Sequence, residues 1–282
     1  MTKYELITNK FIESLNEGVI PWKKGWNTVG GTARNYITKR EYSGINRLIL
    51  NTSKFSCPFW ATMKQINELG GKVNKGEKST IVVFYANYAK EDPETQIESK
   101  FFAMKTYLVL NLAQTSGINW TKDLETNNDF KPIEIADELV KNYETCPEIV
   151  HNDQQAFYSF IADYINMPKS STFKSTEEYY GTLFHEMIHS TGHVSRLNRE
   201  TLNSIAHFGD HSYSKEELVA EIGASFLLSN AGLENDHTLE NSKAYIQSWI
   251  KALESDPKLI LQAASLAEKA VGYILGEKAK DA

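Results

Sequence analysis

The residues best suited to chemistry lie in the segment HEMIH, which begins at His185. Ser175 is followed three residues later by Glu178, a capping-box pattern that predicts a helix start, and Gly192 marks its end. On that helix His185 and His189 lie four residues apart on one face, where two imidazoles can bind one zinc ion. The segment therefore predicts a Zn²⁺ site.

The acid between the two histidines completes this pattern. Glu186 follows the first predicted ligand and can take a proton from a water molecule at the metal, so we expect it to be the general base. The alternative is a pair of surface histidines flanking an acid, since a five-residue pattern also arises by chance. Apolar neighbours such as Leu183 and Ile188 favour a helix packed on a core, and with it the zinc interpretation.

A catalytic zinc ion needs a third protein ligand. The long signature HExxHxxGxxH is absent, because Ser195 stands where its third histidine would be. In SKEELVAEIGASFLL, Glu217 and Glu221 share one face of a predicted helix, and either can be the ligand. Ser214 and Glu217 also form a capping-box pattern, so the competing interpretation is that Glu217 only caps its own helix.

Two further features near this site concern the substrate. Four side chains are candidate donors to the developing negative charge: His193, His207, His211 and Tyr213. Tyr213 is our first choice because it precedes the glutamate helix directly, and for each candidate a solvated loop residue is the alternative. Residues 163–167, which precede Pro168, predict an edge strand with which an extended substrate can pair.

The first third of the chain is basic although the net charge is -6. Residues 1–90 carry 14 Lys and Arg and 6 Asp and Glu, which gives 14 - 6 = +8 and leaves -14 for the rest. Aromatic rings among cations are typical of single-stranded DNA binding, where rings stack on bases and cations follow the phosphates. Ordinary core packing of Trp22 and several tyrosines is the alternative. The candidate DNA contacts are Trp22, Lys23, Lys24, Trp26, Arg34, Tyr36, Lys39, Arg40, Tyr42, Asn46, Arg47, Lys72, Lys75 and Lys78.

The order of predicted elements favours an α+β class with two domains. An amphipathic helix opens the chain, residues 59–69 are predicted helical, and residues 79–89 and 101–112 predict two strands joined by a charged turn. A polar stretch over residues 117–132 predicts the boundary, which gives domains 1–120 and 121–282, the second of them helix-rich.

Composition limits the class of protein. Of the 282 residues 41% are hydrophobic and 23% charged, which supports a packed core. Cys57 and Cys146 are the two cysteines, so a disulfide scaffold or a cysteine-zinc module is not expected. No apolar run approaches the ~20 residues that cross a bilayer, and the opening segment does not read as a secretory signal. We expect a cytoplasmic protein.

Longer sequence blocks carry a family resemblance. The first half contains IPWKKGW, RNYITKREYSGINRLIL, FWATMKQINELGGKVNKGEKSTIVVFY and LVLNLAQTSGI, and the second contains AFYSFIADYINMP, YYGTLFHEMIHSTGH with a following RLNR, and YSKEELVAEIGASFL. In these blocks the chain resembles the ArdC-type antirestriction proteins of plasmids and other mobile elements. The resemblance implies an N-terminal single-stranded-DNA-binding domain, a C-terminal zincin-like metallopeptidase domain, and protection of incoming DNA from restriction.

The glutamate segment also resembles the corresponding helix of dipeptidyl peptidase III, a gluzincin. That resemblance implies Glu217 as the zinc ligand, with Glu216 and Glu221 as carboxylates that orient the histidines. Three hypotheses follow: a DNA-tethered zinc peptidase acting on a host protein, a single-stranded-DNA shield with a structural metal, and a regulatory protease that cleaves a repressor.

Overall fold

The computed structural model describes residues 1–22, 32–51, 53, 55–91, 98–124, 132–203, 211–233 and 242–277. Its chain forms two compact units that interleave along the sequence. Unit 1 comprises Met1–Asn27, Ser43–Thr52 and Asn127–Ala282, and unit 2 comprises Thr28–Tyr42 and Ser53–Thr126. The expected α+β class is confirmed. The division at residue 120 stays a prediction, and in the structure two N-terminal segments belong to the same unit as the C-terminal half.

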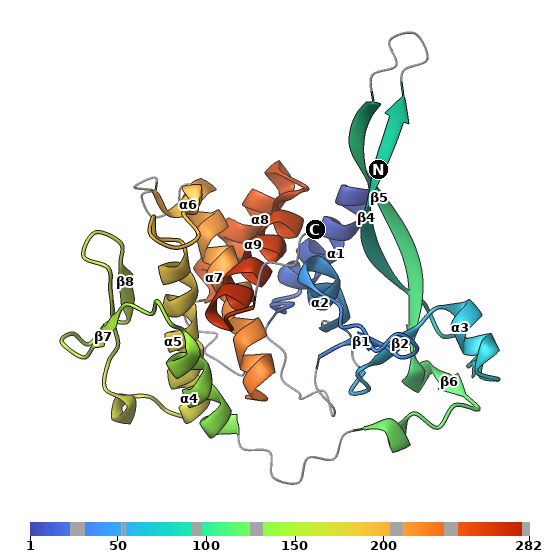
Figure 1. The fold of residues 1–282 in the computed structure, drawn as a ribbon, viewed down its shortest axis with the longest axis horizontal. Coiled ribbons are helices and arrows are strands. Elements are labelled where there is room, and N and C mark those ends of the chain that lie inside the picture. The colour runs from blue at the N-terminus through green and yellow to red at the C-terminus, as the bar shows by residue number, and fades with distance from the viewer. Residues whose placement is uncertain are drawn as a thin grey trace. The chain divides into compact units, whose positions relative to one another are not determined.

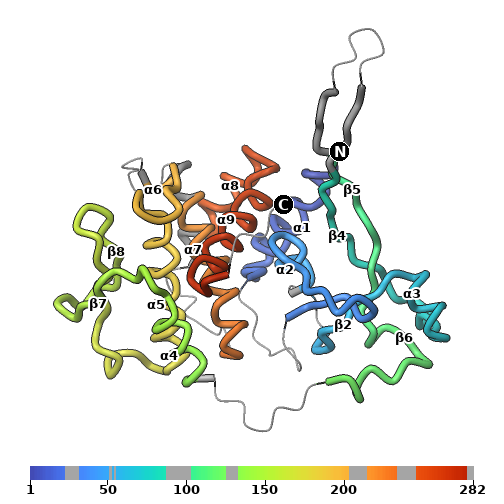
Figure 2. Tube along the Cα trace, viewed as in Figure 1, coloured from blue at the N-terminus to red at the C-terminus, as the bar shows by residue number. Residues whose placement is uncertain are grey.

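Unit 1 is built mainly of helices, which Figures 1 and 2 show in blue and from green to red. They are α1 (Lys3–Asn16), α2 (Gly44–Asn51), α4 (Pro132–Asn142), α5 (Thr176–Thr191), α6 (Glu200–Asn203), α7 (His211–Ala231), α8 (Ser242–Ser255) and α9 (Leu259–Ile274), with a 3-10 turn over Ser170–Thr172. The predicted opening helix is confirmed as α1, whose start is fixed by a capping box between Thr2 and Glu5.

Helix α7 lies at the centre of unit 1, in contact with α4, α5, α6, α8 and α9. Its side chains Leu218, Val219, Ile222 and Phe226 are fully buried, as expected for a helix with neighbours on all sides. Small residues of α9, such as Ala263 and Ala267, are also fully buried and allow close packing. The helix that carries the predicted third ligand is therefore held by the core.

A three-stranded sheet completes unit 1. Its strands β7 (Glu148–Val150), β8 (Phe157–Ser159) and β9 (Tyr164–Asn166) are ordered β7-β9-β8. The prediction of an edge strand over residues 163–167 is wrong, because β9 pairs with β7 on one side and with β8 on the other. A central strand has its backbone groups bonded on both sides and cannot accept an extended peptide.

Unit 2 is a small α+β body. Strands β1 (Arg34–Asn35), β2 (Phe59–Ala61), β5 (Glu98–Asn111) and β4 (Thr80–Glu91) form one sheet in that order, and β3 (Lys72–Val73) pairs with β6 (Thr115–Ser116). Helix α3 (Met63–Glu68) and 3-10 turns over Leu112–Gln114 and Thr121–Asp123 complete it. The predicted hairpin is confirmed, since β4 and β5 pair antiparallel over twelve residues.

The helix predicted over residues 59–69 is only partly right. Residues Phe59–Ala61 form β2, and the helix begins after Thr62, whose side chain and that of Gln65 make a capping box. All three strand residues are buried, and Phe59 and Ala61 belong to the core of unit 2. Tertiary packing therefore overrides the helical pattern there. Within the described residues, no helix has the length and apolar character to cross a membrane.

Candidate metal centre

Helix α5 carries the HEMIH segment in its last turns. The Ser175 side chain accepts a hydrogen bond from the Glu178 backbone N–H at 3.2 Å, which confirms the predicted start. The Glu178 carboxylate, however, accepts from the Lys174 N–H at 2.7 Å, so the reciprocal half of the box is displaced by one residue. Gly192 is the C-cap, as predicted.

Helix α7 approaches α5 closely at a glycine. A Cβ built on Gly223 would lie 2.7 Å from Cδ1 of Ile188, which is nearer than real Cβ contacts allow. The helix begins at His211, so Ser214 lies inside it, and the interpretation of Glu217 as part of a helix cap is wrong. The close approach instead brings Glu217 to the face of α5 that carries the histidines.

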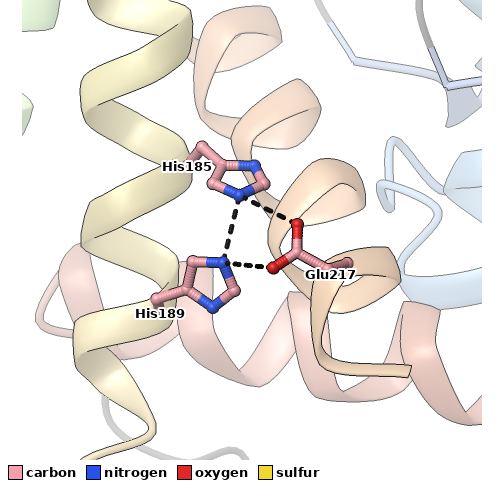
Figure 3. Close-up of side chains that lie close together, drawn as sticks. All are labelled: His185, His189 and Glu217. Atoms are coloured by element: carbon pink, nitrogen blue, oxygen red, sulfur yellow. Dashed lines mark hydrogen bonds and ion pairs between the residues drawn. The ribbon is translucent and has the colours of Figure 1, made fainter. Parts of the chain in front are cut away.

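Three side chains converge between these helices (Figure 3). The Nε2 atoms of His185 and His189 are 3.0 Å apart. The Glu217 carboxylate lies across both, with Oε2 3.5 Å from His185 Nε2 and Oε1 3.4 Å from His189 Nε2. Because one donor atom from each residue lies within 4.8 Å of the other two, the group has the size and composition of a divalent-cation site.

The outer nitrogens of both imidazoles face carboxylates. His189 Nδ1 lies 3.2 Å from Glu216 Oε1, and His185 Nδ1 lies 3.7 Å from Glu221 Oε1. A carboxylate at hydrogen-bond distance from Nδ1, as Glu216 is at His189, fixes the ring and directs Nε2 at the cation site. The arrangement fits Glu217 as the third ligand and Glu216 and Glu221 as orienting groups.

An arginine outside the predicted site residues holds Glu216 in place. Arg199 is buried; its Nη2 lies 2.5 Å from Glu216 Oε1 and its Nε donates to Oε2 at 3.1 Å. It also donates to the Ile188 carbonyl at 2.7 Å, and Thr201 donates to Glu216 Oε2 at 2.6 Å. The only sequence signal for Arg199 was its place in the RLNR block.

The charges of this cluster shift its pKa values strongly. Burial by itself would lower the pKa of His189, but hydrogen bonds to Glu216 and Glu217 raise it to about 10. The pKa of His185 is raised by Glu217 in the same way. Burial would raise the pKa of both glutamates, but hydrogen bonds from the histidines, with Arg199 at Glu216, hold both well below the usual range. Both carboxylates therefore stay ionised beside the imidazoles.

The proposed general base lies on the same helix. Glu186 is 8% exposed, and it is near enough to His185 for its charge to raise the pKa of that imidazole. Among the predicted charge donors, His193 packs its ring on Phe160 and lies 2.7 Å from Ser195 Oγ. His207 and the side chains of His211 and Tyr213 lie outside the described residues.

A second ion pair ties the sheet to the end of α5. Arg196 pairs with Asp163 and donates to the Ser190 carbonyl at 2.6 Å, while Tyr158 donates to Asp163 at 2.7 Å. Burial would raise the pKa of Asp163, but the hydrogen bonds from Arg196 and Tyr158 outweigh it and lower that pKa. The segment after HEMIH is thus anchored at both arginines, Arg196 and Arg199.

The predicted DNA contacts separate into groups. Trp22 is 2% exposed and packs edge-on against Trp249, and Arg47 is 4% exposed, donating to the Phe226 carbonyl at 2.9 Å. This corrects the expectation that these two contact DNA, because neither has a face left for a base or a phosphate. Asn46 lies beside Arg47 in α2 and is half-buried.

The other predicted contacts belong to unit 2 or lie outside the described residues. Lys39 places Nζ 4.3 Å from the centre of the Tyr36 ring, whose hydroxyl donates to Asp123. Arg34 and Tyr42 are half-buried. The remaining described side chains are exposed: Arg40, Lys72, Lys75 and Lys78. Lys23, Lys24 and Trp26 lie outside the described residues.

Comparison with known proteins finds a separate family for each half of the chain. Residues 1–110 match the N-terminal domain of anti-restriction factor ArdC, and residues 134–266 match the zincin-like metallopeptidase family. The metal-free crystal structure of antirestriction ArdC protein from R388 plasmid is similar with a TM-score of 0.80, at 32% identity over 98% of both chains. The chain belongs to the ArdC antirestriction family.

A second crystal structure of the same ArdC protein and one further relative also match this ArdC-family chain. The Mn(II)-bound structure of antirestriction ArdC protein from R388 plasmid matches with a TM-score of 0.76 at 32% identity, over the whole of both chains. DNA primase TraC of Escherichia coli is 32% identical over 297 residues, which cover 98% of this chain and 20% of the primase. The chain thus spans about a fifth of that relative.

Proposed function

We propose that this ArdC-family chain is an antirestriction protein that binds single-stranded DNA and hydrolyses a protein substrate at a divalent-metal site. The observation that carries the peptidase half is the convergence of His185, His189 and Glu217. An Mn(II)-bound structure of the R388 plasmid ArdC protein supports a divalent cation, and the His2Glu donor set favours zinc.

In this proposal each side chain has a separate task. His185, His189 and Glu217 hold the cation, which when bound polarises a peptide carbonyl and acidifies a water. Glu186 takes a proton from water on a carboxylate oxygen and returns it to the leaving amine. Glu216 and Glu221 keep the imidazole Nε2 atoms directed at the cation site.

The DNA half of the proposal is supported by the matched ArdC N-terminal domain and by the exposed cations of unit 2. Single strands are the form that ring stacking and phosphate contacts recognise without a base sequence. The protein substrate is a host restriction or regulatory protein.

The test is an antirestriction assay with Glu186→Gln. Unmodified plasmid DNA enters a restricting host that expresses the wild-type chain, the Glu186→Gln variant, or the control Glu177→Gln from the first turn of the same helix. We expect the wild type and the control to protect. The Glu186→Gln variant should lose protection while it retains one metal per chain by elemental analysis.

Two results would contradict this proposal. Full protection by Glu186→Gln would show that DNA coating, not hydrolysis, protects. Protein purified from zinc- or manganese-supplemented cells without a bound metal would remove the peptidase half.

A further inference from the structure

The exposed aromatic side chains of the described residues gather on one ribbon. In the part of the chain that the structure describes, twelve large apolar side chains are exposed, and the aromatic ones among them are Phe84 at 53%, Tyr85 at 47% and Tyr107 at 48%. Leu108, at 57%, lies beside them. All belong to the facing segments 81–85 of β4 and 104–108 of β5, here called the aromatic ribbon, seen in Figure 1 as part of the green strand pair.

The strand pairing shows which side chains share a face. Phe84 is opposite Lys105, and Tyr107 is opposite Val82, so these four side chains lie on one face of the aromatic ribbon. The centroids of the Phe84 and Tyr107 rings are 6.5 Å apart, and the two ring planes form an angle of 76°. Tyr85 lies on the other face, opposite Met104.

The aromatic ribbon lies beyond the part of the sheet that has a third strand. In the described residues β2 pairs with β5 only at Leu110 and Asn111, so segments 81–85 and 104–108 pair only with each other. A two-stranded ribbon is marginally stable by itself, and exposing rings there costs hydration free energy. A cluster of exposed rings at such a place marks an interaction surface.

The lysines near the aromatic ribbon favour a partner that carries phosphate groups. Outside the acidic turn, residues 72–90 and 100–110 contain six lysines and one glutamate, a balance of 6 - 1 = +5, whereas residues 91–99 carry four acidic residues and no lysine or arginine. Lys105 is exposed and stands directly across from Phe84, so a cation and a ring lie side by side on one face. Phosphate next to an unpaired base matches that combination, whereas an apolar protein surface does not use the charge.

We propose that the Phe84, Tyr107 and Lys105 face of the aromatic ribbon is a stacking site for single-stranded nucleic acid. Bases stack on the two rings, and Lys105 contacts the phosphate between them. None of these three residues was among the DNA contacts predicted from the sequence. This inference rests on the DNA-binding half of the proposed function and gives it a location.

The experiment is a fluorescence-anisotropy titration of the full chain with a fluorescein-labelled oligo(dT) strand and with an abasic strand of equal length. Because each ring supplies stacking to a base, Phe84→Ala and Tyr107→Ala should each weaken oligo(dT) binding about tenfold. Binding to the abasic strand should not change. Phe84→Trp and Tyr107→Phe keep a ring and should retain wild-type affinity. Met63→Ala, an exposed apolar residue at 49% in α3, is the control.

Each outcome decides a separate claim. A wild-type chain that binds neither strand overturns the DNA half of the proposed function, and the stacking site with it. Wild-type binding with unchanged affinity in both alanine variants overturns the stacking site and leaves the proposed function standing. An alanine variant that loses both strands equally, or that changes only the oligomeric state by light scattering, assigns the aromatic ribbon to another role and also overturns the proposal.

Discussion

The candidate metal centre in unit 1 and the aromatic ribbon in unit 2 differ in how far their side chains are buried and held by partners. At the metal centre, His189, Glu216 and Arg199 are at most 8% exposed, and each has several partners. On the aromatic ribbon, Phe84 and Tyr107 are about half exposed and lie on two paired strands. Chemistry at a cation needs fixed donor positions, whereas stacking on bases of any sequence tolerates mobile rings.

This difference in burial predicts which mutations should reduce stability and which should reduce only binding. A buried ion pair leaves an uncompensated charge when one partner is removed, so the metal centre should be sensitive in stability and function together. An exposed ring is already hydrated in the folded protein, so its loss should affect binding and leave stability intact. Four substitutions test this contrast.

Arg199→Met should have the largest effect on stability. It removes the cation that pairs with buried Glu216, and breaking such a pair costs about 3–5 kcal/mol. Urea unfolding of the metal-free protein gives the change in free energy. Zinc affinity should also fall about 10–100-fold, because Glu216 no longer orients His189. A loss under 1 kcal/mol with unchanged zinc affinity would show that Arg199 is not a positioning residue.

Gly223→Ala should come next. The added Cβ meets Ile188 at 2.7 Å, and overpacking costs about 1–3 kcal/mol, more than the gain of about 0.5–1 kcal/mol from placing alanine in a helix. Combining it with Ile188→Val, which removes Cδ1, should recover part of that loss in thermal unfolding. Strict additivity of the two changes would mean that this contact does not set the helix spacing.

Asp163→Asn should produce a smaller effect that depends on pH. The folded pKa of Asp163 is lowered, so its contribution is present above the unfolded value of about 3.9 and is lost as the pH falls further. Among the described residues, Arg196, His193 and Tyr158 are the charged and titratable groups that face it. Urea unfolding at pH 6.5 and pH 3.5 should show a stability difference from wild type that shrinks at the lower pH. A constant difference would assign the effect to packing.

Phe84→Ala should have the smallest effect on folding. Its ring is 53% exposed, so we expect a change within about 0.5 kcal/mol, measured by thermal unfolding beside Met63→Ala. A loss above 2 kcal/mol would mean that the ring belongs to the core of unit 2, and the contrast between the two regions would disappear.

Helices and strands could be predicted from the sequence more reliably than contacts between segments that are far apart in the chain. Helix α5 and the β4–β5 hairpin followed from caps and from β-branched runs, because those signals are local. Core packing of Trp22 was the alternative interpretation, and the burial of Arg47 was not predicted. Composition could not decide either case, since the burial depends on packing against Trp249 and Phe226, more than 170 positions away. Composition suggested DNA contacts at residues that the fold uses as core.

The same limit applies to the metal centre. The spacing of His185 and His189 follows from one helix, whereas the third ligand depends on how α7 meets α5. The central position of β9 depends on the pairing of β7, which the sequence around residues 163–167 does not contain. Arg199, which precedes α6, was missed because its partner Glu216 lies on α7.

The most direct test of the proposed cation site is isothermal titration calorimetry of zinc with the metal-free chain and with two variants. We expect one tight site per wild-type chain, at least a hundredfold weaker binding for Glu217→Ala, and near wild-type affinity for Glu144→Ala, an exposed control. Wild-type zinc affinity in Glu217→Ala would contradict the claim that these two helices build one cation site.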